Sequence, residues 1–167
     1  MQREPQLSLR LDGTAPDPGA RWHDGATIPY LGGSLRLALG TGGKDARLEG
    51  AILHLPLPPQ ATPRQIQDRA EAWLRDAARR QLADIIGQKS ALAGRRPPRL
   101  ILSFAARGHW AEADGPEDLR CNWRLIEQAQ PVIEQVITRA IAALPSAAQE
   151  AAQEAAKEAD LFGALPA

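Results

Sequence analysis

The amino-acid sequence predicts an α+β fold, built as a small antiparallel β-sheet with two main helices. Residues 26–56 alternate apolar and polar side chains around glycines, which is the pattern of short β-strands. Two later segments, which begin near Pro63 and Pro131, instead repeat their apolar residues at helical spacing. Strands followed by helices on one side of a sheet are typical of α+β domains.

The strands are expected in two groups. Residues 27–31 and 34–39 flank Gly32-Gly33, which predicts a β-hairpin, and a second pair flanks the glycines near Gly42 and Gly50 and ends at residues 52–56. Further along the chain, residues 100–104 and 119–123 are short apolar runs, and a loop over residues 111–116 lies between them.

The first helix has a clear start. Thr62 is expected to cap it, Pro63 suits its first position, and Gln65 completes a capping box. Gly87 is the expected stop, followed by a loop over residues 88–98. The second helix should run from about Pro131 to the interruption at Pro145.

Composition divides the chain into three parts. Residues 1–25 are rich in Pro, Gly and Asp and predict a flexible N-terminal arm, whereas residues 26–145 form the expected domain. Residues 146–167 are a low-complexity tail rich in Ala and Glu. Those residues favour a helix, but a helix that buries little surface is marginal on its own.

Charge and composition argue against nucleic acids and membrane surfaces as direct binding partners. The chain has 20 basic and 20 acidic residues, so it lacks the basic excess that binds nucleic acid or a membrane surface directly. We find neither an apolar run long enough to span a membrane nor the apolar core of a signal peptide. The single cysteine, Cys121, fits a reducing compartment, so a cytoplasmic location is expected.

Several segments, in order, resemble one known family. The most specific is Asn-Trp-Arg-Leu-Ile at residues 122–126, and Val-Ile-Glu-Gln-Val-Ile follows at residues 132–137. Together with segments at residues 28–37, 53–56 and 72–74, they resemble the YgjP-like metallopeptidases, which are grouped with the SprT-like zincins. The resemblance covers roughly residues 26–144 and implies a zincin-like α+β fold.

The family's zinc-binding motif is replaced in this chain. In the family the next residues are His-Glu-Leu-Ala-His-Leu, where two histidines four residues apart bind zinc and the glutamate acts as base. Here Arg139 and Ala143 stand at the histidine positions and Ala140 at the glutamate position, and no histidine follows His109. An arginine cannot bind zinc because it offers no lone pair. The resemblance therefore implies a degenerate peptidase with no metal ligands and no cofactor.

Other residues mark the expected remnant of the peptidase cleft. They are Trp110, Asn122, Trp123 and Arg124, with the tryptophans expected in the core and Asn122 and Arg124 as a polar pair. The alternative is an active metal-dependent hydrolase with displaced ligands, for example a site built from His109, Cys121 and a carboxylate.

The two ends resemble peptides that bind the bacterial DNA polymerase sliding clamp. Residues 158–162, Glu-Ala-Asp-Leu-Phe, are similar to the Q-x-x-L-F form, although Glu158 replaces the preferred glutamine. Residues 6–9, Gln-Leu-Ser-Leu, are similar to the Q-L-S-L form, although Arg10 replaces a preferred phenylalanine. The expected binding residues are Gln6, Leu7, Leu9, Asp160, Leu161 and Phe162. The alternative is that Leu161 and Phe162 fold back onto the core of their own domain.

These observations favour a non-catalytic protein that binds a protein or peptide partner through its old cleft or its ends, with the sliding clamp as the sharpest candidate. Two other classes remain open at this stage. One is the hydrolase with displaced ligands, and the other is a structural or oligomer-forming role for the alanine-rich tail.

Overall fold

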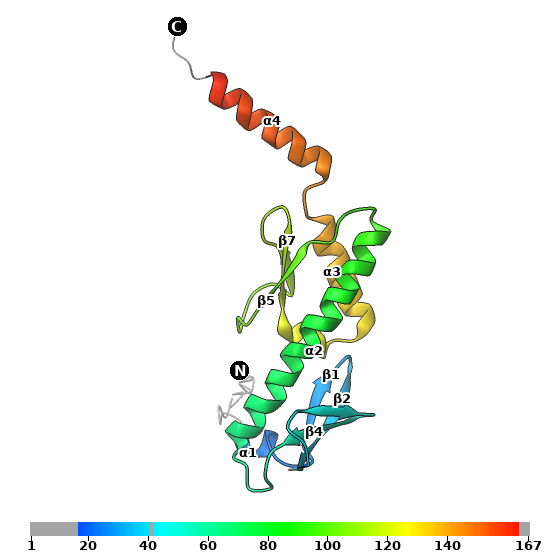
Figure 1. Cartoon of the computed structure of the whole chain (residues 1–167), viewed down its shortest axis with the longest axis vertical. Helices are drawn as coiled ribbons and strands as arrows, with labels where there is room; N and C mark the ends of the chain where they lie inside the picture. Colours follow the sequence, from blue (N-terminus) through cyan, green and yellow to red (C-terminus); the bar gives the residue numbers. More distant parts are fainter. Residues whose placement is uncertain (1–16, 41, 164–167) are drawn as a thin grey trace, which may run out of the picture.

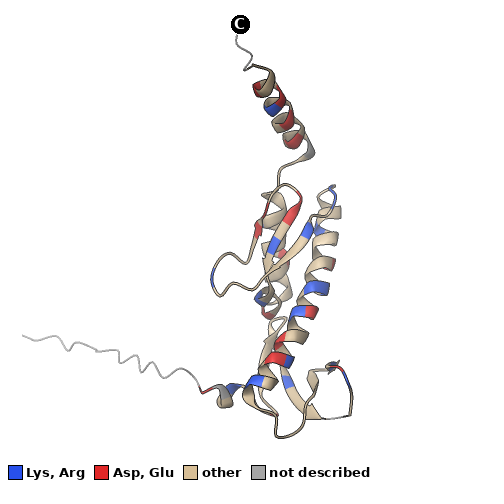
Figure 2. Ribbon diagram, turned by 60° about the vertical axis from the view of Figure 1, so that its left-hand side comes forward, with Lys and Arg blue, Asp and Glu red and all other residues tan. Residues whose placement is uncertain are grey.

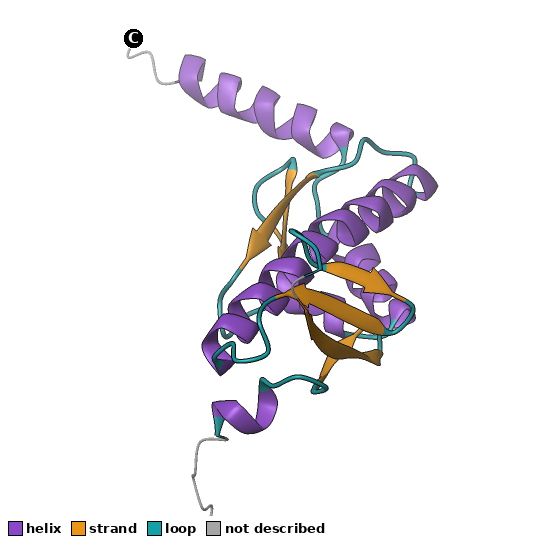
Figure 3. Cartoon of the chain, turned by 60° about the horizontal axis from the view of Figure 1, so that its bottom comes forward, coloured by secondary structure: helices purple, strands orange, loops and turns teal. Residues whose placement is uncertain are grey.

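The computed structural model describes residues 17–40 and 42–163 and confirms the α+β fold. The strands form two small sheets (Figures 1 and 3). The first has the order β1-β2-β4-β3, and the second has the order β5-β7-β6. The strands are β1 (Thr27–Tyr30), β2 (Gly33–Gly40), β3 (Arg47–Glu49), β4 (Ile52–Pro56), β5 (Arg99–Ser103), β6 (Ala111–Ala113) and β7 (Asp118–Asn122).

The prediction of one antiparallel sheet is corrected in two ways, because there are two sheets and both are mixed. Strands β2 and β4 are parallel, as are β5 and β7, while the other pairs are antiparallel. The order of the first sheet follows from burial. Strand β4 buries Leu53 and Leu55 almost completely, whereas β3 has only the partly buried Leu48. The more apolar strand therefore takes the inner position, between β2 and β3.

The predicted hairpin is confirmed, and its turn fastens the first sheet to the rest of the molecule. The turn residues are Leu31 and Gly32, with φ of 48° and 79°, and such positive values are typical of a two-residue type I′ turn. The Leu31 amide donates to the Ile126 carbonyl at 2.8 Å, and the Gly32 amide donates to the Glu127 carbonyl at 3.1 Å. Because both acceptors lie in η1 (Trp123–Glu127), the turn holds this short helix in place.

The remaining helices are α1 (Pro18–Arg21), α2 (Pro63–Leu92), α3 (Gln130–Ala142) and α4 (Ala147–Gly163). The predicted capping box of α2 is confirmed, since Thr62 and Gln65 exchange hydrogen bonds of 2.9 and 3.2 Å. The predicted stop at Gly87 is wrong. The last turns continue to bury side chains on both sides of Gly87, and the chain leaves the helix at Gly94, whose φ is 63°.

Helix α2 is the central helix and contacts both sheets, η1 and α3. It runs past the first sheet with its N-terminal half and past the second sheet and α3 with its C-terminal half (Figure 1). Its buried residues join both sheets, η1 and α3 in one hydrophobic core. Trp22, which the sequence placed in the N-terminal arm, is also in this core and is only 6% exposed.

Helix α4 projects away from this body (Figure 1). Every residue from 151 to 163 is exposed. Leu161 and Phe162 are 79% and 76% exposed, so the alternative in which they fold back onto their own core is wrong. No helix in the described part of the chain is long and apolar enough to cross a membrane.

Candidate functional site

Arg139, Ala140 and Ala143, the residues that the sequence resemblance aligns with the family's zinc motif, lie at the end of α3. Arg139 and Ala143 share an exposed face one helical turn apart, with the Ala143 amide donating to the Arg139 carbonyl at 3.1 Å. Ala140 is buried against the core, with 6% exposure. The two positions therefore lie on the same face of the helix, as any residues four apart do. The side chains on that face are a cation and a methyl group, neither of which can donate a lone pair to a metal.

The histidines do not replace these ligands. His54 lies on β4, where its Nε2 is 3.0 Å from an oxygen of Glu49, and His23 contacts the Asp24 carbonyl through Nδ1. His109 belongs to the β5–β6 loop. Among residues 17–40 and 42–163 there is no group of three His, Cys, Asp or Glu side chains placed to hold a metal ion. The donor set of the described residues therefore does not fit a catalytic zinc.

Cys121 does not form a reactive site with His109. The thiol is fully buried on β7, and burial raises the pKa of Cys121 to about 12. A thiol held in the protonated state is a poor metal ligand and a poor nucleophile. Cys121 therefore behaves as a small core residue, and the displaced site with His109 has no support in this geometry.

Two residues of the expected cleft remnant, Trp123 and Arg124, belong to a larger arrangement, the arginine–aromatic cluster. It consists of Glu71 and Arg75 on α2, Phe104 after β5, and Trp123, Arg124 and Glu127 in η1. The Arg75 guanidinium lies between two rings, 5.3 Å from the centroid of Phe104 and 5.2 Å from that of Trp123. The Arg124 guanidinium stacks on Trp123 at 4.6 Å. Cation–π contacts of this kind are each worth about 0.5–1 kcal/mol at partly exposed sites.

Two glutamates hold the guanidinium groups from below. Glu71 is 3.1 Å from Arg75 and 3.7 Å from Arg124, and Glu127 is 2.8 Å from Arg124. The carboxylate side chains are only 13% and 18% exposed, whereas those of the arginines are 42% and 41% exposed. The arginines are therefore the more exposed partners of these ion pairs. The buried Nε of Arg75 has no hydrogen-bond partner among the described residues.

Asn122 positions the loop beside the cluster. Its Nδ2 donates to the Ala105 carbonyl at 3.0 Å, its Oδ1 accepts from the Arg124 amide at 3.0 Å, and its own amide donates to the Trp110 carbonyl at 2.8 Å. Asn122 thereby caps η1 and fixes both ends of the loop between Phe104 and Trp110. The predicted polar pair is thus a real contact, made through the Arg124 backbone.

This loop exposes two aromatic rings. Phe104 is 56% exposed and Trp110 is 44% exposed, and between them Arg107 and His109 are also exposed. The expectation that Trp110 is a core residue is therefore wrong, whereas Trp123 is buried as expected. Trp110 lies in the loop directly before β6, which is a three-residue edge strand.

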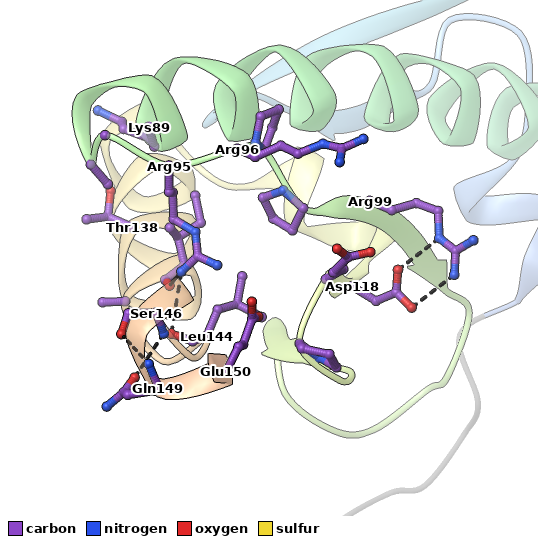
Figure 4. Close-up of a pocket in the computed structure, with 18 residues that line it drawn as sticks. Lys89, Arg95, Arg96, Arg99, Asp118, Thr138, Leu144, Ser146, Gln149 and Glu150 are labelled. Atoms are coloured by element: carbon purple, nitrogen blue, oxygen red, sulfur yellow. Dashed lines mark hydrogen bonds and ion pairs between the residues drawn. The ribbon is translucent and has the colours of Figure 1, made fainter. Parts of the chain in front are cut away.

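A hollow of about 1150 Å³ lies where α4 leaves the body (Figure 4). Most of its cations are engaged in structural bonds. Lys89 pairs with Glu134 at 2.7 Å, which lowers the pKa of the Glu134 carboxyl, and Arg99 pairs with Asp118 at 2.8 Å. Arg95 donates to three carbonyls at the C-terminal end of α3 at 3.3–3.4 Å. This hollow is a junction that fixes the exit of α4.

The structure describes the predicted binding residues at the C-terminal end but not those at the N-terminal end. Asp160, Leu161 and Phe162 lie on the last turn of α4, so the Asp-Leu-Phe segment is helical and exposed. Gln6, Leu7 and Leu9 lie outside the described residues. Trp123 and Arg124 belong to the cluster and Asn122 lies beside it, at a site separate from α4.

Sequence reasoning missed Glu71, Arg75 and Phe104. The spacing of Glu71 and Arg75 is that of an ordinary helical ion pair, and Phe104 only ends a strand. Nothing in the sequence links these residues to Trp123, because the link depends on the packing of η1 against α2.

Comparison with known proteins places the chain in a family. Residues 6–138 match the model of the YgjP-like metallopeptidase domain. Neither a search of curated proteins nor a search of solved structures found a significant match. Because the family match covers most of the chain, this protein belongs to the YgjP-like metallopeptidase family. The match ends at Thr138, one residue before Arg139.

Proposed function

We propose that this chain is a non-catalytic member of its family that binds a protein partner through the exposed end of α4. The observation that carries the proposal is the contrast between two sites. The face that carries zinc ligands in the family presents Arg139 and Ala143, whereas Leu161 and Phe162 present two large apolar side chains to solvent.

The bacterial sliding clamp is the candidate partner. The segment Glu158–Phe162 is similar to clamp-binding peptides in its acidic residue followed by Leu-Phe. Two adjacent apolar anchors can fill a hydrophobic pocket, and such anchors supply most of the binding energy in a peptide interface. The segment is helical in the free chain, so its last turn would have to open for an extended peptide to bind.

Binding to purified sliding clamp tests the proposal directly. Full-length protein should bind in isothermal titration calorimetry, and the double variant Leu161→Ala/Phe162→Ala should lose at least about tenfold in affinity, as expected for interface anchors. Leu92→Ala is the matched control, because Leu92 is 82% exposed on α2 and should not matter. Equal binding by the wild type and the double variant would remove α4 from the interface.

Metal content separates the proposal from the hydrolase alternative. Untagged protein, purified without chelator, should contain substoichiometric zinc by mass spectrometry, because Arg139, Ala140 and Ala143 supply no ligand. One tightly held zinc per chain would overturn the non-catalytic assignment. A peptidase assay on the same preparation would then identify the alternative function.

A further inference from the structure

The end of α4 and the arginine–aromatic cluster have complementary chemistry. Helix α4 carries four acidic residues and a single lysine, and its last turns present Glu158 and Asp160 next to Leu161 and Phe162. The cluster and its loop present exposed guanidinium groups beside the exposed rings of Phe104 and Trp110. An acidic segment with apolar anchors is complementary to exposed guanidinium groups that lie beside exposed aromatic rings. Figure 2 shows that acidic residues recur along α4.

We propose that this chain self-associates, with the acidic and apolar end of α4 in one copy docked on the arginine–aromatic cluster of a second copy. The inference goes beyond the proposed function and stands whether or not the sliding clamp binds. It concerns the same Leu161–Phe162 segment, so self-association would cover the segment until a competing partner displaces it.

Helix α4 needs contacts that its own copy does not provide. It has 17 residues, and each residue from 151 to 163 is exposed. Most of the stability of helices in proteins comes from tertiary packing of an apolar face rather than from intrinsic helix propensity. A second copy that covers the end of α4 would supply the missing burial.

Docking within one copy is opposed by the way α4 leaves the body. Arg95 holds the carbonyls of Ile141, Leu144 and Pro145, and Ser146 and Gln149 form a capping box with hydrogen bonds of 2.9 and 3.3 Å. The Arg95 bonds hold the chain up to Pro145, and the capping box begins α4 directly after it, so that α4 points away from the body (Figure 1). Docking on a second copy keeps this arrangement, and the exchange can be reciprocal about a twofold axis.

The cluster favours an acidic protein segment over a single-stranded nucleic acid. Arg75 and Arg124 are each paired with a glutamate of the same cluster, which leaves Arg107 as the uncommitted arginine of the loop. A nucleic acid requires a track of uncompensated cations along its phosphates. One or two carboxylates with apolar neighbours fit the smaller positive surface that is present.

Sedimentation velocity of the full-length protein over a wide concentration range is the test. Wild type should show a concentration-dependent dimer that weakens as salt is raised. Leu161→Ala/Phe162→Ala and Phe104→Ala/Trp110→Ala should each weaken dimerisation by at least about tenfold, whereas Leu92→Ala should not. A wild type that stays monomeric, or a dimer that survives either double variant, would overturn the proposal.

Mixing the two double variants gives a sharper result. One has an intact cluster and the other an intact α4 end, so their mixture should form a heterodimer with one of the two reciprocal contacts, while each alone stays monomeric. The absence of a heterodimer would contradict docking between copies. Circular dichroism of each variant checks that the fold is kept.

The same variants separate this inference from the proposed function. Phe104→Ala/Trp110→Ala keeps the α4 end and should bind the sliding clamp at least as well as wild type. Clamp binding without self-association would refute only the self-association. Self-association without clamp binding would refute only the proposed partner.

A 21-nucleotide single strand of thymidines, used as a competitor, should not dissociate the dimer. Dissociation would assign the cluster to nucleic-acid binding instead.

Discussion

Gly32→Ala tests whether the hairpin turn is built against the rest of the protein. Gly32 has a φ of 79°, and a Cβ at this position would lie 2.8 Å from both Cα and Cβ of Ala129. Ala129 directly precedes α3, and its backbone cannot move without moving that helix. The left-handed backbone alone costs an alanine about 1–2 kcal/mol, and overpacking against backbone adds roughly 1–3 kcal/mol. The expected loss in the free energy of unfolding is therefore about 2–5 kcal/mol.

Gly50→Ala is the matched control. Gly50 also has a positive φ, 59°, but a Cβ there would meet nothing within 4 Å. It should lose only the conformational part, about 1–2 kcal/mol. Urea denaturation followed by tryptophan fluorescence measures both, with the buried Trp22 and Trp123 as probes. If Gly32→Ala costs no more than Gly50→Ala, the close approach of the turn to Ala129 is wrong.

Three other changes test the cluster, the junction and the core. Asn122→Ala should lower the free energy of unfolding by about 1–3 kcal/mol, because it removes two part-buried hydrogen bonds. Gln130→Ala removes an exposed hydrogen bond and should cost less than about 0.5 kcal/mol in the same urea titration. Arg95→Met should lower the free energy of unfolding by about 1–3 kcal/mol, because three hydrogen bonds are lost. The control Arg96→Met changes an exposed neighbour and should cost less than about 0.5 kcal/mol. Equal losses would contradict a structural role for the Arg95 hydrogen bonds. Burial raises the pKa of Cys121 from 9.0 to about 12, so above pH 9 the unfolded chain releases a proton that the folded chain keeps. Above pH 9 the free energy of unfolding should therefore fall with pH more steeply in the wild type than in Cys121→Ala, by about 1.4 kcal/mol per pH unit. If the two proteins lose stability with pH at the same rate, the raised pKa of Cys121 is refuted.

Local rules explain why so much of the fold was predictable. The hairpin, the capping box at Thr62 and the two main helices each depend on residues within a few positions of one another. The stop at Gly87 failed because a glycine inside a helix costs only about 1 kcal/mol. The turn beyond it still buries Ser90 and pairs Lys89 with Glu134. The parallel pairing of β2 with β4 also escaped prediction, because strand order depends on which strand is buried deepest.

For the candidate site too, some features follow from the sequence and others only from the tertiary structure. The sequence alone determined that Arg139, Ala140 and Ala143 carry no metal-binding atoms, because ligand chemistry is a property of the side chain itself. It also determined that Leu161 and Phe162 end a weakly apolar tail. Only the tertiary structure decided that both are exposed, and that η1 packs on α2 so that Arg75 lies between Phe104 and Trp123. Those two contacts join residues 29 and 48 positions apart, and no local pattern records which distant side chains will meet.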